Sequence, residues 1–92
     1  MPGPVYRAEP ARHLCRVSLD TLDLIYHRAS GITHVVAEPV PQILAALERG
    51  QADAAEVARR LAATHDIDPR EAEPVVAARL AELEAVGLVV RA

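Results

Sequence analysis

The 92-residue chain carries a formal net charge of −3, with 13 acidic side chains against ten arginines and no lysine. That length fits a single domain with a modest core, and the acidic balance disfavours nucleic acid or an anionic membrane as the main partner. One cysteine excludes an internal disulfide, and we see neither a leader pattern nor an apolar run of about 20 residues, so we expect a cytoplasmic protein.

Residues 1–12 contain three prolines and little periodicity, which predicts an extended N-terminal arm before a domain at residues 13–92. The run at residues 13–18 is a candidate first strand. It contains Cys15, with His13 two positions away. A nucleophilic cysteine needs a base and an electropositive pocket, and in a chain this small we expect a packed thiol instead.

Two β-rich runs flank Ala29-Ser30-Gly31 and predict a hairpin. Gly31 stands where a three-residue loop needs positive φ, which glycine adopts without a Cβ clash. This loop pairs Tyr26 with His34 and makes residues 32–37 the edge strand of a three-stranded meander. On one face, expected to meet the helices, lie Leu22, Leu24, Tyr26, His34 and Val36. On the other, expected to be partly wet, lie Asp23, Ile25, His27, Thr33 and Val35.

After Glu38 the apolar spacing changes from two to about 3.6 residues. Helices are predicted over residues 39–47, 53–64 and 74–86, with Gly50 and Gly87 as left-handed caps. Capping-box patterns begin at Asp53 and Asp68. Pro74 follows the second, which predicts either one turn and a kink or a helix that begins near Pro74. The predicted core is Leu24, Val36, Ile43, Leu44, Leu47, Val57, Leu61, Leu80 and Leu83.

No group of residues in the sequence has the pattern of an active site. His27 and His34 fall on opposite faces of the predicted hairpin without ligands at a suitable spacing, so no metal site is expected. Ser18 and Ser30 lack a triad pattern, and the four glycines are too scattered for a phosphate-binding loop. We therefore expect no catalytic residue, no cofactor and no enzymatic activity of the chain alone.

Several short motifs follow one another in a recognisable order: a strand pair before Pro39, Ile43-Leu44, Val57-Ala58-x-x-Leu61 and Leu80-Ala81-Glu82-Leu83-x-x-x-Gly87-Leu88-Val89. In this order and spacing, over roughly residues 13–90, the chain resembles the PqqD family of peptide chaperones, also called precursor-peptide recognition elements. The hairpin segment Tyr26-His27-Arg28-Ala29-Ser30-Gly31-x-Thr33-His34 resembles the branch associated with a relative of HPr kinase.

The resemblance implies an α+β, winged-helix-like domain in which a three-stranded antiparallel sheet is followed by three helices. It implies a chaperone that captures the leader of a ribosomally made precursor peptide as an added strand. The peptide is then presented to a modifying enzyme, such as a radical SAM enzyme or an HPr-kinase-like protein. Backbone pairing at an exposed edge gives affinity, and alternate side-chain pockets give specificity. The implied peptide-binding residues are Ile32, Thr33, His34, Val35, Val36, Val76, Arg79, Leu80 and Leu83.

Two further interpretations stay open. A winged-helix DNA-binding regulator needs a basic face, for which the sequence offers only Arg59-Arg60 with Arg7 and Arg12. The segment 68–86 carries five acidic residues against two arginines, which disfavours a recognition helix there. A structural subunit, by contrast, would fill the exposed strand edge with a second copy as a homodimer.

Overall fold

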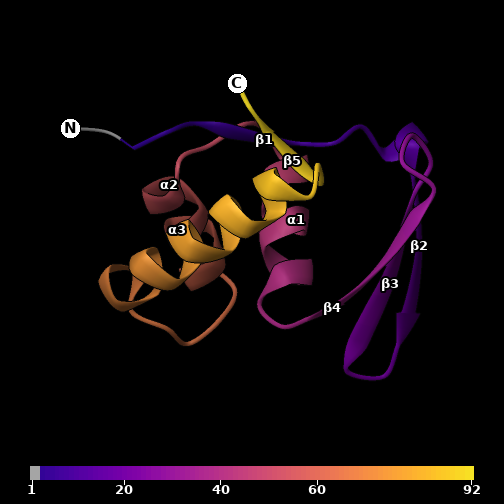
Figure 1. The fold of residues 1–92 in the computed structure, drawn as a ribbon. Helices are drawn as coiled ribbons and strands as arrows, with labels where there is room; N and C mark the ends of the chain where they lie inside the picture. The colour runs from indigo at the N-terminus through magenta and orange to yellow at the C-terminus, as the bar shows by residue number, and fades with distance from the viewer. Residues whose placement is uncertain (1–2) are drawn as a thin grey trace.

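The computed structural model describes residues 3–92, so the first two residues of the predicted arm lie outside the described chain. The elements in order are β1 (Tyr6–Ala8), a 3-10 turn (Ala11–His13), β2 (Leu14–Leu19), β3 (Leu22–His27), β4 (Ile32–Ala37), α1 (Val40–Glu48), α2 (Ala54–Ala62), α3 (Pro69–Ala85) and β5 (Val89–Arg91). The antiparallel sheet β2-β3-β4 lies to one side of the three helices (Figure 1). This arrangement confirms the predicted α+β class with a three-stranded antiparallel sheet followed by three helices.

A second, two-stranded sheet joins the two ends of the chain. β1 runs antiparallel to β5, with Tyr6 opposite Arg91, and Tyr6 also bridges to Ala52 before α2. The strand is bounded by Pro4 and Pro10, so no proline interrupts its hydrogen bonding. Because Tyr6 is buried in the core, the described part of the predicted arm belongs to the packed body.

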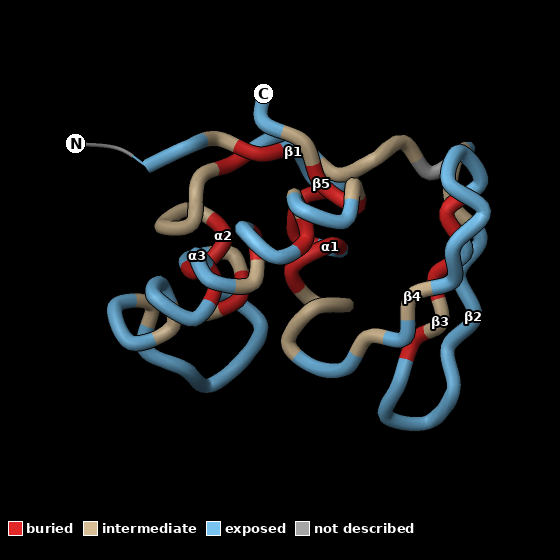
Figure 2. Tube along the Cα trace, viewed as in Figure 1, coloured by how far each residue is buried: buried red, intermediate tan, exposed pale blue. Residues whose placement is uncertain are grey.

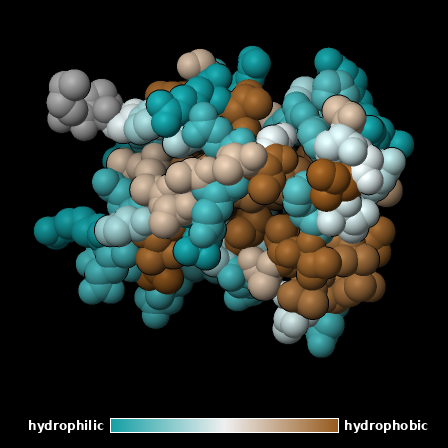
Figure 3. Space-filling view, viewed as in Figure 1, coloured by the Kyte–Doolittle hydropathy of each residue, from teal (hydrophilic) through white to brown (hydrophobic). Residues whose placement is uncertain are grey.

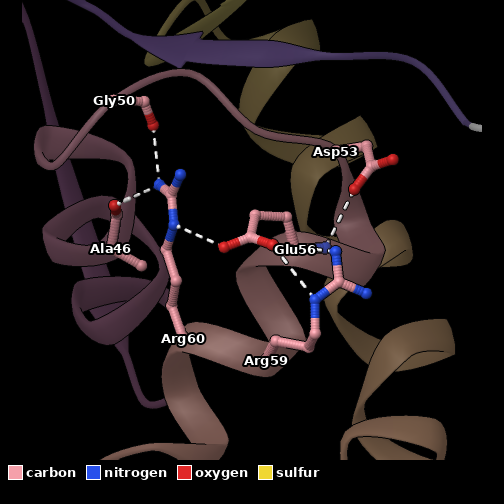
Figure 4. Close-up of polar contacts among 6 residues, drawn as sticks. All are labelled: Ala46, Gly50, Asp53, Glu56, Arg59 and Arg60. Carbon is pink, nitrogen blue, oxygen red and sulfur yellow. Dashed lines mark hydrogen bonds and ion pairs between the residues drawn. The ribbon is translucent and has the colours of Figure 1, made fainter.

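Capping side chains begin α2 and α3. Asp53 Oδ1 accepts a hydrogen bond from Glu56 N at 2.9 Å, as the sequence predicts. Glu56 does not reach back to the cap, and its carboxylate instead accepts from Arg59 and Arg60 (Figure 4). Asp68 accepts from the backbone N–H of Arg70. Half of the predicted capping box at Asp53 is therefore formed, whereas Asp68 caps α3 through the residue two positions on and not through Glu71.

The third helix is longer than the sequence predicts. It runs without a break from Pro69 through Pro74 to Ala85, so the prediction that the main helix begins near Pro74 is wrong. Pro74 lies in the second turn and removes one hydrogen bond, and the burial of Val76 and Leu80 beyond it offsets that loss.

The C-terminal end of α3 has the predicted left-handed cap. Gly87 has φ 82°, which a Cβ would disfavour. Gly87 N donates to Glu84 O and Leu88 N donates to Leu83 O, which is the Schellman pattern. This cap directs Leu88 and Val89 back into the core.

The core contains most of the predicted residues and several others. Seven of the nine predicted members are buried, whereas Leu24 and Val36 are only partly buried. The large buried residues outside that prediction are Tyr6, Ile25, Val76, Leu88 and Val89.

The hairpin register differs by one residue from the prediction. Tyr26 pairs with Thr33 rather than His34, because the loop spans the four residues 28–31. Gly31 takes the expected positive φ of 72°, but its N–H donates to His27 O and so closes a longer turn. A shift of one residue sends the side chains of one strand to the other face relative to its partner.

The face of β3 that meets the body is also the opposite of the predicted one. Asp23, Ile25 and His27 are buried, and Leu22 and Tyr26 are exposed (Figure 2). The two ionisable residues tolerate burial because each has a partner: Asp23 lies 3.1 Å from Arg16, and His27 lies 2.6 Å from Glu9. Cys15, predicted to be packed, is exposed.

Candidate functional site: a groove between β4 and α3

A groove of about 490 Å³ lies between β4 and the C-terminal half of α3. The sheet supplies one wall, α3 supplies the other, and the start of α1 closes one end. Its lining is part apolar and part charged. The lining residues are Thr33, His34, Val35, Val36, Ala37, Glu38, Val40, Arg79, Glu82, Leu83, Val86 and Leu88.

The strand beside this groove is the edge of its sheet. Within residues 3–92, β4 pairs only with β3, so one side of its backbone has no strand partner. Arg28 N donates to His13 O, which directs the backbone groups of Arg28 toward β2. Backbone direction alternates along a strand, so Ile32, His34 and Val36 bond to β3 and the groups of Thr33 and Val35 point outward.

Six of the nine residues expected to bind a peptide line the groove. Thr33, His34, Val35 and Val36 come from β4, and Arg79 and Leu83 come from α3. Val76 and Leu80 lie beneath the groove in the core, with 2% and 0% of their surface exposed. Ile32 lies at the hairpin end of β4, outside the lining.

Sequence reasoning missed the other half of the lining. Glu38 and Val40 closely follow β4, Glu82 lies three residues after Arg79, and Val86 lies three residues after Leu83. The i, i+3 spacing from Arg79 to Glu82 and from Leu83 to Val86 is the signal that identifies them, because residues at this spacing share a helix face.

Two buried nitrogen atoms in the groove wall have no hydrogen-bond partner among residues 3–92: His34 Nε2 and Arg79 Nε. Arg79 Nε is 3.3 Å from Glu82 Oε2, close enough for an ion pair but not aligned as a hydrogen bond. Buried polar atoms are nearly always satisfied.

The charges around the groove are mixed. Glu38 and Glu82 are acidic, and Arg79 is the one arginine in the lining. Because Arg79 already pairs with Glu82, an acidic side chain of a ligand would compete with this contact. Recognition through backbone groups and apolar side chains therefore suits the groove better than recognition through charge.

A second polar cluster joins the hairpin to the N-terminal segment. His27 Nε2 lies 2.6 Å from Glu9 Oε2, and His27 Nδ1 lies 3.0 Å from Ser30 Oγ. The hydrogen bond from His27 is the main reason that the pKa of Glu9 is lowered, with burial opposing it and His13 adding to it. Ser30 Oγ also accepts from Ile32 N at 3.3 Å. The Ser30 hydroxyl thus caps the hairpin turn. It is also the last member of a chain of contacts from Glu9 through His27 to Ser30, which the sequence did not indicate.

The paired arginines of α2 are engaged in contacts within the protein (Figure 4). Arg60 Nη1 donates to Ala46 O at 2.9 Å and to Gly50 O at 2.7 Å, which ties α2 to the end of α1. Arg59 and Arg60 both bond to Glu56, and these bonds hold the pKa of the Glu56 carboxyl below its usual range, with Arg59 the larger cause. Two of the four arginines that a DNA-binding face would need are therefore neutralised locally.

Within residues 3–92, no group of three or more His, Cys, Asp or Glu side chains is placed to hold a metal ion. No helix in this part of the chain is long and apolar enough to cross a membrane.

Comparison of the chain with protein-family models, curated proteins and solved structures gave no match.

Proposed function

We propose that this chain is a peptide chaperone that binds the leader of a ribosomally made precursor peptide by strand addition at β4. The observation that carries the proposal is a strand edge that has no partner among residues 3–92 and lies beside a groove of about 490 Å³. The chaperone is proposed to act without chemistry of its own and to present the bound peptide to a modifying enzyme of the radical SAM or HPr-kinase-like kind. This role agrees with the resemblance of the sequence to the PqqD family.

In the proposed complex the leader is extended and lies along β4. The outward N–H and C=O groups of Thr33 and Val35 pair with its backbone, and alternate side chains of the leader enter the groove. The exposed or partly buried apolar residues Val36, Val40 and Val86 receive those side chains.

The contacts of the basic residues support a peptide ligand over DNA. A DNA-binding domain gains most of its affinity from arginines and lysines that reach phosphates. Here Arg60 is bonded to two backbone carbonyls and Glu56, and Arg79 is paired with Glu82. A salt titration against nonspecific duplex DNA tests this directly, because micromolar affinity that falls steeply with salt would favour the regulator.

The test of the proposal is an NMR titration of the ¹⁵N-labelled chain with synthetic leaders of short precursors encoded next to its gene. We expect the amide signals of Thr33, Val35, Arg79 and Val86 to change chemical shift as the leader is added. The four titration curves should give the same dissociation constant. A scrambled leader of equal composition is the control. Shifts confined to α2, with β4 unmoved, would contradict strand addition.

A further inference from the structure

The outward face of the sheet β2-β3-β4 is apolar and has no charged side chain. The register places nine residues on it in three rows: Cys15, Tyr26 and Thr33; then Val17, Leu24 and Val35; then Leu19, Leu22 and Ala37. Val17, Leu19, Leu22, Tyr26 and Val35 are 39–63% exposed. Brown side chains gather at the lower right of Figure 3, where Figure 1 places β3 and β4.

This distribution reverses what a solvated sheet shows. An antiparallel sheet with one wet face normally has its polar residues outward and its apolar residues inward. In β3 the buried residues include Asp23 and His27, whereas the outward positions are Leu22, Leu24 and Tyr26. At about 3.4 Å per residue and about 4.8 Å between strands, the face measures about 20 Å by 14 Å, close to the largest apolar patches that monomers leave uncovered.

The two ends of this face carry opposite charge. Asp20 lies in the turn between β2 and β3, whereas Glu38, which follows β4 at the same end, lines the groove and accepts a hydrogen bond from Gln42 of α1. Arg28 lies in the loop after β3, and Arg12 precedes β2 at the opposite end. Within residues 3–92, none of these four side chains takes part in an ion pair. The face thus has an uncharged centre, an acidic end and a basic end.

We propose that a second copy of this chain covers the face, with the two sheets packed face to face and their strands antiparallel. A twofold axis that runs across the strands near Val17, Leu24 and Val35 packs this central row on the same row of the second copy. It packs each outer row on the other outer row of the second copy. The same axis sets β2 on β2 of the second copy and brings Arg28 of each copy to Asp20 of the other. An axis along the strands would set like charges together. The face is therefore complementary to itself in only one of these two arrangements.

The size and composition of the face fit a reversible dimer. Packed sheets lie about 10 Å apart with interdigitating side chains, and branched aliphatic residues form most of this face. A footprint near 280 Å² per copy is below the roughly 800 Å² per partner of a standard interface, so the dimer is expected to be weak. The dimer leaves the outward backbone of β4 at the rim of the interface. Its formation does not rest on the proposed function.

The test is sedimentation velocity of the full chain across concentrations from low micromolar to submillimolar. We expect a monomer–dimer equilibrium whose dissociation constant rises at least about tenfold in Val17→Glu, because the dimer would bury an unpaired carboxylate. Val75→Glu is the matched control, since Val75 on α3 is 50% exposed and Val17 is 48% exposed. Circular dichroism of both variants checks that each remains folded.

A second variant tests the orientation. Arg28→Glu is expected to raise the dissociation constant about two- to fivefold, as for the loss of exposed ion pairs, and to make dimerisation less sensitive to salt. A chain that stays monomeric throughout would overturn the proposal, as would equal effects of Val17→Glu and Val75→Glu. Tighter dimers in Arg28→Glu would overturn the antiparallel arrangement.

Discussion

Glu9 and His27 lie 18 residues apart in the chain, and their side chains meet at 2.6 Å between Oε2 and Nε2. The contact joins the segment after β1 to the end of β3. His27 is buried, and its second ring nitrogen lies 3.0 Å from Ser30 in the hairpin loop. One imidazole therefore holds the N-terminal segment, the sheet and the loop in a fixed relationship.

The first prediction concerns the acid stability of this contact. The hydrogen bond from His27 lowers the pKa of Glu9 in the folded state, below the value of about 4.3 in an unfolded chain. Ionised Glu9 therefore stabilises the fold above that value, and this contribution is lost as the pH falls through the folded pKa. We expect the free energy of unfolding of Glu9→Gln, measured by urea denaturation, to fall less on acidification than that of the parent.

Glu71→Gln is the control for this measurement. Glu71 is exposed on α3 and takes part in no ion pair within residues 3–92. An identical pH dependence in Glu9→Gln and the parent would show that the contact with His27 adds no stability.

The second prediction uses two neighbouring valines of β4. Val35→Pro removes an outward N–H, so it should weaken peptide binding while the domain stays folded. Val36→Pro removes an N–H that bonds to β3, opposite Asp23, and should destabilise the sheet by about 3 kcal/mol or more. Peptide affinity by calorimetry and unfolding by urea separate the two effects. If both prolines unfold the domain equally, the inferred backbone direction is wrong.

The third prediction separates the two arginines of α2. The side chain of Arg60 is 19% exposed and donates to two backbone carbonyls, whereas that of Arg59 is 62% exposed and pairs only with Glu56. Arg60→Ala should cost about 1–3 kcal/mol of unfolding free energy, because it removes two charge-assisted hydrogen bonds that join α2 to the end of α1. Arg59→Ala should cost less than about 1 kcal/mol. Equal losses in thermal denaturation would mean that the carbonyl contacts contribute nothing.

The fourth prediction concerns the core beneath the groove. Leu80 is fully buried, and Leu80→Ala should cost about 2–5 kcal/mol in unfolding free energy. Val75→Ala on the exposed face of the same helix should change stability by less than about 0.5 kcal/mol. A loss well under 1 kcal/mol in Leu80→Ala would be incompatible with this position in the core.

Periodicity and capping residues were enough to predict the helices. Asp53, Gly50 and Gly87 mark helix ends through local chemistry, which a sequence displays directly. The start of α3 was missed because the cost of Pro74 is local, whereas the compensating burial of Val76 and Leu80 depends on the tertiary structure. The pairing of β1 with β5 was missed for the same reason, since three-residue strands at opposite ends of the chain show no periodicity.

The orientation of the sheet was beyond sequence reasoning for a different reason. Hydrophobicity assigned Leu22, Leu24 and Tyr26 to the core, but the buried positions include Asp23 and His27. The partners that make this burial tolerable, Arg16 and Glu9, are distant in sequence or on another strand. The position of β4 at the sheet edge did not depend on the face, so six of the nine expected site residues still line one groove.

The antiparallel pairing of β1 with β5 has a consequence for the order of folding. Tyr6 and Arg91 are brought together only after the intervening chain has closed one long loop, and the entropy cost of closure grows with loop length. During synthesis, Tyr6 can bridge to Ala52 early, but Arg7 has no strand partner until Val89–Arg91 has left the ribosome. We therefore expect the helices and the β2-β3-β4 hairpins to form first, and pulse-labelling hydrogen exchange should show the amides of Arg7 and β5 acquiring protection last.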